Sequence, residues 1–252
     1  LYGEGCNGKT TLLNVLIRLL GKRNVSAEPL QAFSEDRFAA SRLFGKLANI
    51  ADDIPARPVA YTGIFKMLTG GSLIKGDEKF RKPFYFENSA KLIFSCNQLP
   101  RVDDETPAFW RRWILIRFPN SFEGRENPHL LHDLVQELPG ILNFALQGLF
   151  RIMAQGKLTE TKTMSEVMEE WKRRTNTVYW FVQEKVEKDI YATISKDELY
   201  TAYVEFCEAN DVPPVSKQKF SQELMRLVPG IRTIQAGERR ERKWQGIKLK
   251  ES

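Results

Sequence analysis

A glycine-rich run near the start of the chain constrains the fold more than any other feature of the sequence. Residues 3–10, Gly-Glu-Gly-Cys-Asn-Gly-Lys-Thr, match the pattern G-x-x-x-x-G-K-[ST] in full. An apolar run from Thr11 to Leu20 follows directly and ends at Gly21, so we expect the loop to lie at the N-terminus of a helix. Backbone N–H groups and the helix dipole favour an anion at that position. The run therefore predicts a phosphate-binding loop.

The residue types in this loop suit a nucleoside triphosphate. Glycines let the backbone close around phosphates, Lys9 can reach the β and γ oxygens, and the Thr10 hydroxyl can bind Mg²⁺. We therefore expect ATP and Mg²⁺ as cofactors. The expected nucleotide-binding residues are Gly3, Glu4, Gly5, Cys6, Asn7, Gly8, Lys9, Thr10 and Thr11. The alternative is a glycine-rich turn that contains Lys-Thr by chance.

Composition excludes several classes of protein. Of the 252 residues, 42% are hydrophobic and 28% are charged, which is typical of a globular chain rather than a disordered or fibrous one. No apolar stretch is long enough to cross a bilayer and no secretion signal opens the sequence, so we expect no membrane partner and a cytoplasmic, intracellular location. The three cysteines lack CxxC spacing, which argues against a disulfide scaffold or a common zinc cluster and favours a reducing compartment.

The net charge of +6 suggests a polyanionic partner, and the charge is concentrated near the C-terminus. Residues 217–250 contain ten Lys or Arg against three Glu. The cations expected to contact DNA there are Lys217, Lys219, Arg239, Arg240, Arg242 and Lys243. The alternative is a polar surface that contacts protein.

Changes in residue pattern predict three domains. Residues 1–125 alternate β-type runs, over 46–51, 91–96 and 113–118, with helical segments, which predicts an α/β sheet domain. Residues 126–188 show helical periodicity and predict a lid or connector. In residues 189–252, a capping box at Ser195 and a break at Pro213-Pro214 predict two helices, and a basic hairpin follows. This order suggests a winged-helix domain.

Polar residues follow two of the predicted strands and could complete an ATPase site. Asp52 and Asp53 come directly after the first run; we assign Asp52 to Mg²⁺ and Asp53 to activation of the attacking water, although the reverse order remains open. Asn97 ends the second run and could hold the same water. The alternatives are a solvated Asp-Asp turn and an ordinary Asx turn before Pro100.

Two further cationic segments are candidates for function. Arg111 and Arg112 open the third run, and either could stabilise charge on the γ-phosphate or form a surface ion pair. Between the turn glycines near residue 70 and Pro83 lies a mixture of cations and one aromatic residue that suits a single strand of nucleic acid: Lys75, Lys79, Phe80, Arg81 and Lys82. A solvated loop is the alternative for this segment.

These segments together resemble a known family. The blocks GEGCNGKT, LANIADDI, LTGGSLIKGDEKFRKPFYF, KLIFSCNQLP and FWRRWILIRFP are similar, in this order, to blocks of the superfamily 3 helicases, specifically the phage- and plasmid-type primase-helicases related to the poxvirus replication helicase. The C-terminal part resembles the winged-helix domain that follows this ATPase. Ser72 departs from the family, which usually has Asp after the paired glycines.

The resemblance implies an AAA+-like P-loop NTPase that hydrolyses ATP between neighbouring subunits of a ring. It makes Lys9 and Thr10 Walker A residues, Asp52 and Asp53 Walker B residues, and Asn97 sensor 1. Arg112, with Arg111 as second choice, is the finger that reaches the adjacent subunit, and residues 70–86 form the pore hairpin.

The predicted function is an ATP-dependent DNA helicase in phage, plasmid or viral DNA replication. Its expected partners are single-stranded DNA, duplex DNA as a second candidate, further copies of itself in a hexamer, and an upstream primase or collar domain. The competing hypothesis is a P-loop ATPase that binds or loads at a replication origin through its winged helix without translocating.

Overall fold

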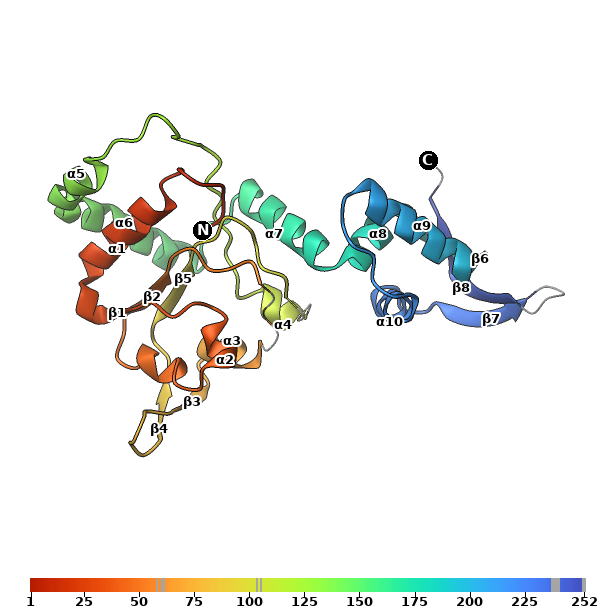
Figure 1. Cartoon of the computed structure of the whole chain (residues 1–252), viewed down its shortest axis with the longest axis horizontal. Helices are drawn as coiled ribbons and strands as arrows, with labels where there is room; N and C mark the ends of the chain where they lie inside the picture. Colours follow the sequence, from red (N-terminus) through yellow and green to blue (C-terminus); the bar gives the residue numbers. More distant parts are fainter. Residues whose placement is uncertain (58, 60–61, 103, 105, 237–240, 251–252) are drawn as a thin grey trace. The chain divides into compact units, whose positions relative to one another are not determined.

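The chain consists of two compact units, each with its own sheet and its own core (Figure 1). The computed structural model describes residues 1–252 apart from 58, 60–61, 103, 105, 237–240 and 251–252. Unit 1 comprises Leu1–Met168 and unit 2 comprises Glu169–Ser252. This boundary divides the segment 126–188 between the two units, so the predicted three-domain division remains a prediction.

A parallel sheet in the order β1-β2-β5 organises unit 1. Its strands are β1 (Val25–Ser26), β2 (Ala48–Ala51) and β5 (Lys91–Phe94), and β2 pairs in parallel with both neighbours. Tyr2 extends the pairing through parallel bridges to Cys96 and Arg117. The mixed α/β class is confirmed, and so are the first two predicted strands. The third predicted strand, 113–118, was wrong in extent, because only Arg117 forms a bridge there.

The predicted helix after the phosphate loop and the predicted helical segment 126–188 are both helical, and three short helices between them were not predicted. The helices are α1 (Lys9–Leu20), α2 (Ala32–Glu35), α3 (Gly63–Leu68), α4 (Pro107–Trp110), α5 (Leu130–Gln136), α6 (Leu138–Gln155) and α7 (Lys162–Thr175), which crosses the boundary, with 3₁₀ turns at Lys22–Asn24 and Ala40–Leu43. Leu13 of α1 packs in one buried cluster with Ala48 and Ile50 of β2. This contact anchors the helix that follows the phosphate loop onto the sheet.

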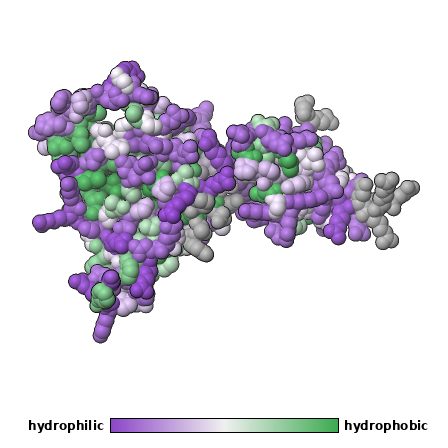
Figure 2. Space-filling view, viewed as in Figure 1, coloured by the Kyte–Doolittle hydropathy of each residue, from purple (hydrophilic) through white to green (hydrophobic). Residues whose placement is uncertain are grey.

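Helices α5 and α6 contribute no buried residue to unit 1. Apolar side chains of α6 lie in solvent, and Phe144 and Met153 are 76% and 71% exposed. Hydrophobic side chains also gather over the part of unit 1 that holds α1 and α5 (Figure 2). Among the described residues, no helix, α6 included, is both long enough and apolar enough to cross a membrane.

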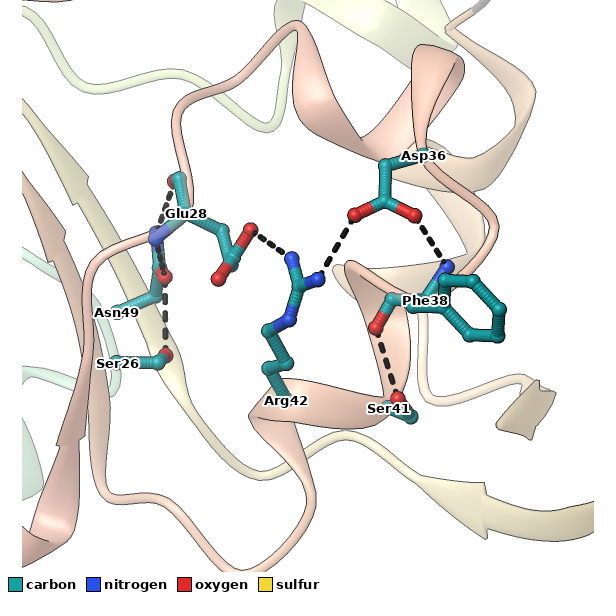
Figure 3. A network of polar contacts seen from close by, with 7 residues as sticks. All are labelled: Ser26, Glu28, Asp36, Phe38, Ser41, Arg42 and Asn49. Atoms are coloured by element: carbon teal, nitrogen blue, oxygen red, sulfur yellow. Dashed lines mark hydrogen bonds and ion pairs between the residues drawn. The ribbon is translucent and has the colours of Figure 1, made fainter. Parts of the chain in front are cut away.

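A polar network fixes the segment between β1 and β2 (Figure 3). The side chain of Asn49, which is fully buried on β2, donates to the carbonyl of Glu28 and accepts from the Glu28 N–H and the Ser26 hydroxyl. Arg42 forms ion pairs with Glu28 at 2.8 Å and Asp36 at 2.9 Å. Because the Phe38 N–H and the Arg42 guanidinium favour the charged form, the pKa of Asp36 is lowered. The network holds β2 in register ahead of the two aspartates.

A separate two-stranded hairpin belongs to unit 1. It pairs β3 (Leu73–Gly76) with β4 (Phe84–Glu87) in antiparallel register, with Lys75 opposite Tyr85. Ile74 and Phe86 are buried, and Phe44 packs edge-on against Phe86 with ring centroids 5.5 Å apart. These contacts fix the base of the hairpin, and its connecting turn projects away from the sheet (Figure 1).

Unit 2 combines three helices with a three-stranded sheet in the order β6-β8-β7. After α8 (Thr177–Lys185) come β6 (Val186–Ser195), α9 (Lys196–Ala209), α10 (Lys217–Leu227), β7 (Arg232–Ala236) and β8 (Glu241–Leu249). The predicted helices and the antiparallel β7–β8 hairpin are observed. Ser195 caps α9, its hydroxyl accepting from the Asp197 N–H. Aromatic residues dominate the core, including Phe181, Tyr203, Phe220 and Trp244.

Strand β6 was not predicted, and its irregular register explains why. Val186 and Ile194 at its ends are buried, but its pairing with β8 shifts between Asp189 and Thr193. Within that bulge Ile190 and Tyr191 are 71% and 88% exposed. The alternation that marks a strand in a sequence is therefore interrupted.

Candidate nucleotide-binding site

The backbone of the glycine-rich loop is left-handed at two positions and closely packed at a third. Gly8 has φ of 87° and is the N-cap of α1, and Cys6 has φ of 52°. A Cβ atom at Gly3 would lie 2.3 Å from the carbonyl oxygen of Phe118, so no other residue fits there. The loop thus closes over the start of α1, where unpaired N–H groups attract anions.

Lys9 is the buried cation at the centre of this loop, with 6% of its surface exposed. Its ammonium group donates to the carbonyls of Gly3 and Glu4, at 2.6 and 2.8 Å. It also donates to the side-chain oxygens of Asn7 at 3.1 Å and Asn97 at 3.0 Å. These oxygens compensate the cost of burying the charge. The last contact brings together two predicted site residues that lie 88 positions apart.

Asn7 joins the loop to a distant segment of the chain. Its amide nitrogen donates to the Phe118 carbonyl at 3.2 Å, and its oxygen accepts from the backbone and the side chain of Lys9. Only 7% of Asn7 is exposed. Asn7 therefore helps to hold the Lys9 ammonium in place inside the loop.

The two predicted aspartates follow β2, and both are exposed. The Asp52 carboxylate accepts a hydrogen bond from the Ser95 hydroxyl, and the Asp53 N–H donates to Ser95 Oγ at 3.0 Å. Ser95 lies two residues before Asn97 on the neighbouring strand segment. The carboxylates and the Lys9–Asn97 pair therefore lie at the ends of adjacent parallel strands.

The donor set suits a magnesium ion that arrives with a nucleotide. Thr10 and Asp52 are exposed and offer a hydroxyl and a carboxylate, which are hard oxygen ligands. Mg²⁺ in nucleotide sites takes one or two carboxylates together with phosphate oxygens and water. No group of three or more His, Cys, Asp or Glu suited to a metal is found in the part of the chain that the structure describes. The residues therefore fit a metal held jointly with phosphates.

The two candidate arginines have different surroundings. Arg112 is half-buried and its guanidinium donates to the carbonyl of Ala108, within its own helical turn. Its Nε atom is buried and has no hydrogen-bond partner among the described residues. Arg111 is exposed. Arg111 is therefore the more accessible of the two, although the sequence favoured Arg112.

The β3–β4 hairpin carries cations on both sides of one aromatic residue in the sequence. Phe80 is 95% exposed, has φ of 63°, and lies 5.0 Å from the Lys79 ammonium. Lys75 pairs with Asp77 at 3.1 Å, and Arg81 pairs with Glu78 at 2.7 Å. Lys82 is also exposed. The turn therefore presents an aromatic ring and four cations, two of which have acidic partners.

The predicted DNA contacts of unit 2 lie on α10 and β8. Lys219 is exposed, and Lys217 is exposed but forms an ion pair with Asp197. Arg242 is exposed and Lys243 is half-buried. Two further predicted residues, Arg239 and Arg240, lie outside the described residues.

Sequence reasoning missed Ser95, which is fully buried and binds both aspartates. The available signal was a hydroxyl residue within the otherwise apolar run 91–96. It also missed Gln31, equally buried, whose amide donates to the carbonyls of Pro55 and Arg57 beyond the aspartates. Neither contact can be derived from spacing, because each joins segments at least 24 residues apart.

Comparison with known families now adds to this geometry. Residues 1–112 match a family of unknown function, DUF5906, and residues 173–245 match the family described as Poxvirus D5 protein-like. A protein of Acanthamoeba polyphaga mimivirus, named as a "putative helicase", is 30% identical over 129 residues, which cover 48% of this chain and 13% of that protein. The chain is homologous to viral replication proteins.

A second relative matches both units. A protein of African swine fever virus, named as a "putative primase", is 24% identical over 235 residues, which cover 82% of this chain and 24% of that protein. The chain thus spans a quarter or less of the length of these relatives. The resemblance to poxvirus D5-like proteins and to viral proteins of the helicase and primase kind is confirmed.

A solved structure shares the fold. The apo structure of the NrS-1 C-terminal region superposes with a TM-score of 0.60 at 14% identity, covering 97% of this chain and 65% of that one. At this identity the likeness concerns the fold alone. It extends over both units of the chain.

Proposed function

We propose that the chain is the motor part of a superfamily 3 helicase of the AAA+ type, which hydrolyses ATP to move along single-stranded DNA in phage, plasmid or viral replication inside a host cell. The observation that carries this proposal is the 3.0 Å contact between Lys9 and Asn97, beside the paired aspartates on the adjacent strand. It supports a single site for the phosphate loop, the acidic pair and the strand-end amide. The strand order, with Tyr2 beyond β5, also supports a P-loop fold.

Each residue has a role in this mechanism. Loop N–H groups and Lys9 bind the phosphates, and Thr10 and Asp52 hold the Mg²⁺ of the substrate. Asp53 activates the attacking water, or exchanges roles with Asp52, and Asn97 orients that water. Hydrolysis also requires a positive charge beside the γ-phosphate, to stabilise the negative charge on its oxygens, and we assign this role to an arginine of a neighbouring subunit in a hexameric ring.

The first experiment tests the nucleotide site alone. Lys9→Ala should abolish binding of a fluorescent ATP analogue, measured by anisotropy, together with DNA-stimulated ATP hydrolysis. Lys22→Ala removes an exposed lysine just beyond α1 and should leave both unchanged. The loop, Lys9 and Asn97 all belong to one chain, so the binding assay applies to this chain by itself. Wild-type affinity retained in Lys9→Ala would contradict the proposal.

The hairpin distinguishes translocation from the competing function, an origin-binding ATPase that does not move. Its exposed Phe80 and the cations beside it favour a strand-tracking role, because bases stack on aromatic rings and phosphates pair with cations. Neutralising Lys79, Arg81 and Lys82 to Gln should abolish unwinding of a forked duplex and leave duplex binding intact. A control triple change, Lys22, Arg23 and Lys157 to Gln, removes three exposed cations elsewhere in unit 1. Retained unwinding in the hairpin variant would contradict a strand-tracking role for the hairpin. Absence of unwinding by the wild-type protein, with duplex binding intact, would favour the origin-binding alternative.

The arginine finger can be assigned by mixing subunits. Subunits carrying Lys9→Ala are mixed with subunits carrying Arg111→Ala or Arg112→Ala, and ATP hydrolysis is measured in rings of verified composition. The arginine that acts in trans should restore activity at mixed interfaces. The exposure of Arg111 and the contact of Arg112 with the Ala108 carbonyl make Arg111 the stronger candidate.

A further inference from the structure

Ser95 is the residue around which the chain bends after β2. It is fully buried, and its backbone N–H donates to the Ala51 carbonyl at 3.0 Å. Its own carbonyl accepts from the Ile54 N–H at 2.8 Å. Two backbone hydrogen bonds therefore hold residues 51–54 around this one position, and neither involves the Ser95 side chain.

The Ser95 side chain adds two contacts inside that bend. Its hydroxyl donates to Asp52 Oδ1, and its oxygen accepts from the Asp53 N–H at 3.0 Å. The Asp53 N–H also lies 3.0 Å from Asp52 Oδ1, which completes a closed ring of three groups. Asp53 has φ of 50°, a left-handed conformation that a residue with a side chain rarely adopts, and these contacts stabilise it.

The ring leaves one oxygen of the Asp52 carboxylate available. Both hydrogen bonds to this carboxylate end on Oδ1, and none to Oδ2 is found within the described part of the chain. A carboxylate held through one oxygen has a fixed orientation, so its other oxygen can face a metal ion or its water ligands without an ordering cost at the moment of binding.

We infer that Ser95 is a positioning residue for magnesium: it orients the Asp52 carboxylate toward the Mg²⁺ of the bound nucleotide. This inference rests on the proposed ATPase function and deepens it, because it names the group that organises the metal side of the site. Ser95 touches neither the nucleotide nor the metal. It acts through Asp52, whose carboxylate accepts a hydrogen bond from its hydroxyl.

The test measures how nucleotide binding depends on magnesium. Ser95→Ala should raise the Mg²⁺ concentration for half-maximal binding of a fluorescent ATP analogue about tenfold, since one hydrogen bond to a charged group is lost. Binding in EDTA should not change. Ser95→Thr keeps the hydroxyl and should retain the wild-type dependence, whereas Ser95→Val, of the same shape as Thr, should behave as Ser95→Ala. This Thr and Val pair provides the comparison even where Ala weakens folding.

Two controls separate positioning from general stability. Ser41→Ala removes another buried hydroxyl of unit 1, which donates to the Phe38 carbonyl, and should not move the magnesium dependence. In an Asp52→Asn background, Ser95→Ala should cause no further shift, because its effect passes through Asp52. A structural defect would instead add to that of Asp52→Asn.

The outcomes distinguish the inference from the function on which it rests. Wild-type magnesium dependence in both Ser95→Ala and Ser95→Val overturns the inference and leaves the ATPase proposal standing. Additive shifts in the Asp52→Asn background overturn it as well. Absence of magnesium-dependent ATP binding by the wild-type chain overturns the proposed function itself.

Discussion

Both units bury aromatic rings, but most of the buried polar side chains among the described residues lie in unit 1. Unit 1 buries polar groups at the ends of its strands: Asn7, Lys9 and Ser95 are at most 7% exposed. Unit 2 buries rings, with Phe181, Tyr203 and Phe220 packed against one another. Buried polar groups are costly unless they are paired, so their concentration at one sheet edge marks a site for chemistry.

The two units also differ in where their cations lie. Three of the cations expected to contact DNA in unit 2, Lys217, Lys219 and Arg242, are exposed on α10 and β8, whereas the central cation of unit 1 is buried among four oxygens. Surface charge suits contact with a polyanion, and a buried, oriented ammonium suits one specific ligand. We therefore expect changes in unit 1 to affect catalysis and changes in unit 2 to affect stability or DNA binding.

The largest expected effect is on the stability of unit 2, when a ring is removed from its core. Phe181 is fully buried and packs edge-on against Tyr203 and Phe206, at 5.5 and 5.6 Å. Phe181→Ala should lower the free energy of unfolding of unit 2 by about 3–5 kcal/mol, measured by urea titration. Binding of a fluorescent ATP analogue should persist. Tyr191→Ala, at an 88% exposed position, should change stability by less than about 0.5 kcal/mol. Loss of nucleotide binding in Phe181→Ala would show that the two units are not independent.

The next effect concerns the reaction in unit 1. Asp53→Asn should reduce ATP hydrolysis by about 10²–10⁴-fold, because a general base is lost, with nucleotide affinity changed little. The control is Asp133→Asn, at an exposed position on α5. If Asp52→Asn causes this loss of turnover and Asp53→Asn instead weakens magnesium binding, the two aspartates have the reverse roles. Normal hydrolysis in both variants would show that the reaction does not take place at this edge of the sheet.

A half-buried ion pair in unit 1, between Lys66 and Asp104, should make its stability depend on pH. Burial alone would raise the pKa of Asp104, but hydrogen bonds from Lys66, Thr106 and Thr62 outweigh burial and lower it strongly. The carboxylate therefore stabilises the fold at neutral pH, and this contribution is lost as the pH falls below about 4 toward the lowered pKa.

Asp104→Asn should accordingly cost about 1–3 kcal/mol of unfolding free energy at pH 7, and less as the solution is acidified. Urea unfolding at several pH values measures this difference, with Asp133→Asn again as the exposed control. A difference that stays constant down to pH 3 would mean that the Asp104 charge contributes nothing to unit 1.

The smallest effect concerns the surface charge of unit 2. Lys219 is exposed without an ion-pair partner among the described residues, whereas Lys217 pairs with Asp197. Lys219→Ala should reduce the slope of log affinity for duplex DNA against log salt by about 0.9, and Lys217→Ala should reduce it less. Lys157→Ala in unit 1 is the control. If none of these changes alters the slope, unit 2 contacts DNA at residues other than Lys217 and Lys219.

Much of the site could be predicted from the sequence because its parts are local. The phosphate loop and α1 are continuous, and Asp52 and Asn97 each follow an apolar run by one or two residues. Parallel strands bring their carboxyl ends to the same edge, so the meeting of Lys9 with Asn97 follows from the predicted topology. The β7–β8 hairpin was predicted for the same reason, since its pattern is contained in one stretch.

Other features were decided by tertiary structure, because they depend on contacts between distant segments. The bulge in β6 hides the strand from any periodicity, and the hydrogen bonds of Gln31 to the Pro55 and Arg57 carbonyls join segments at least 24 residues apart. Ser95 is an unremarkable residue in the sequence; it matters only because β5 lies beside β2. Chain-local patterns therefore determined which residues are candidates for the chemistry. Packing between strands decided which side chains hold these candidates in place, since burial and hydrogen bonding across the sheet exist only in the folded protein.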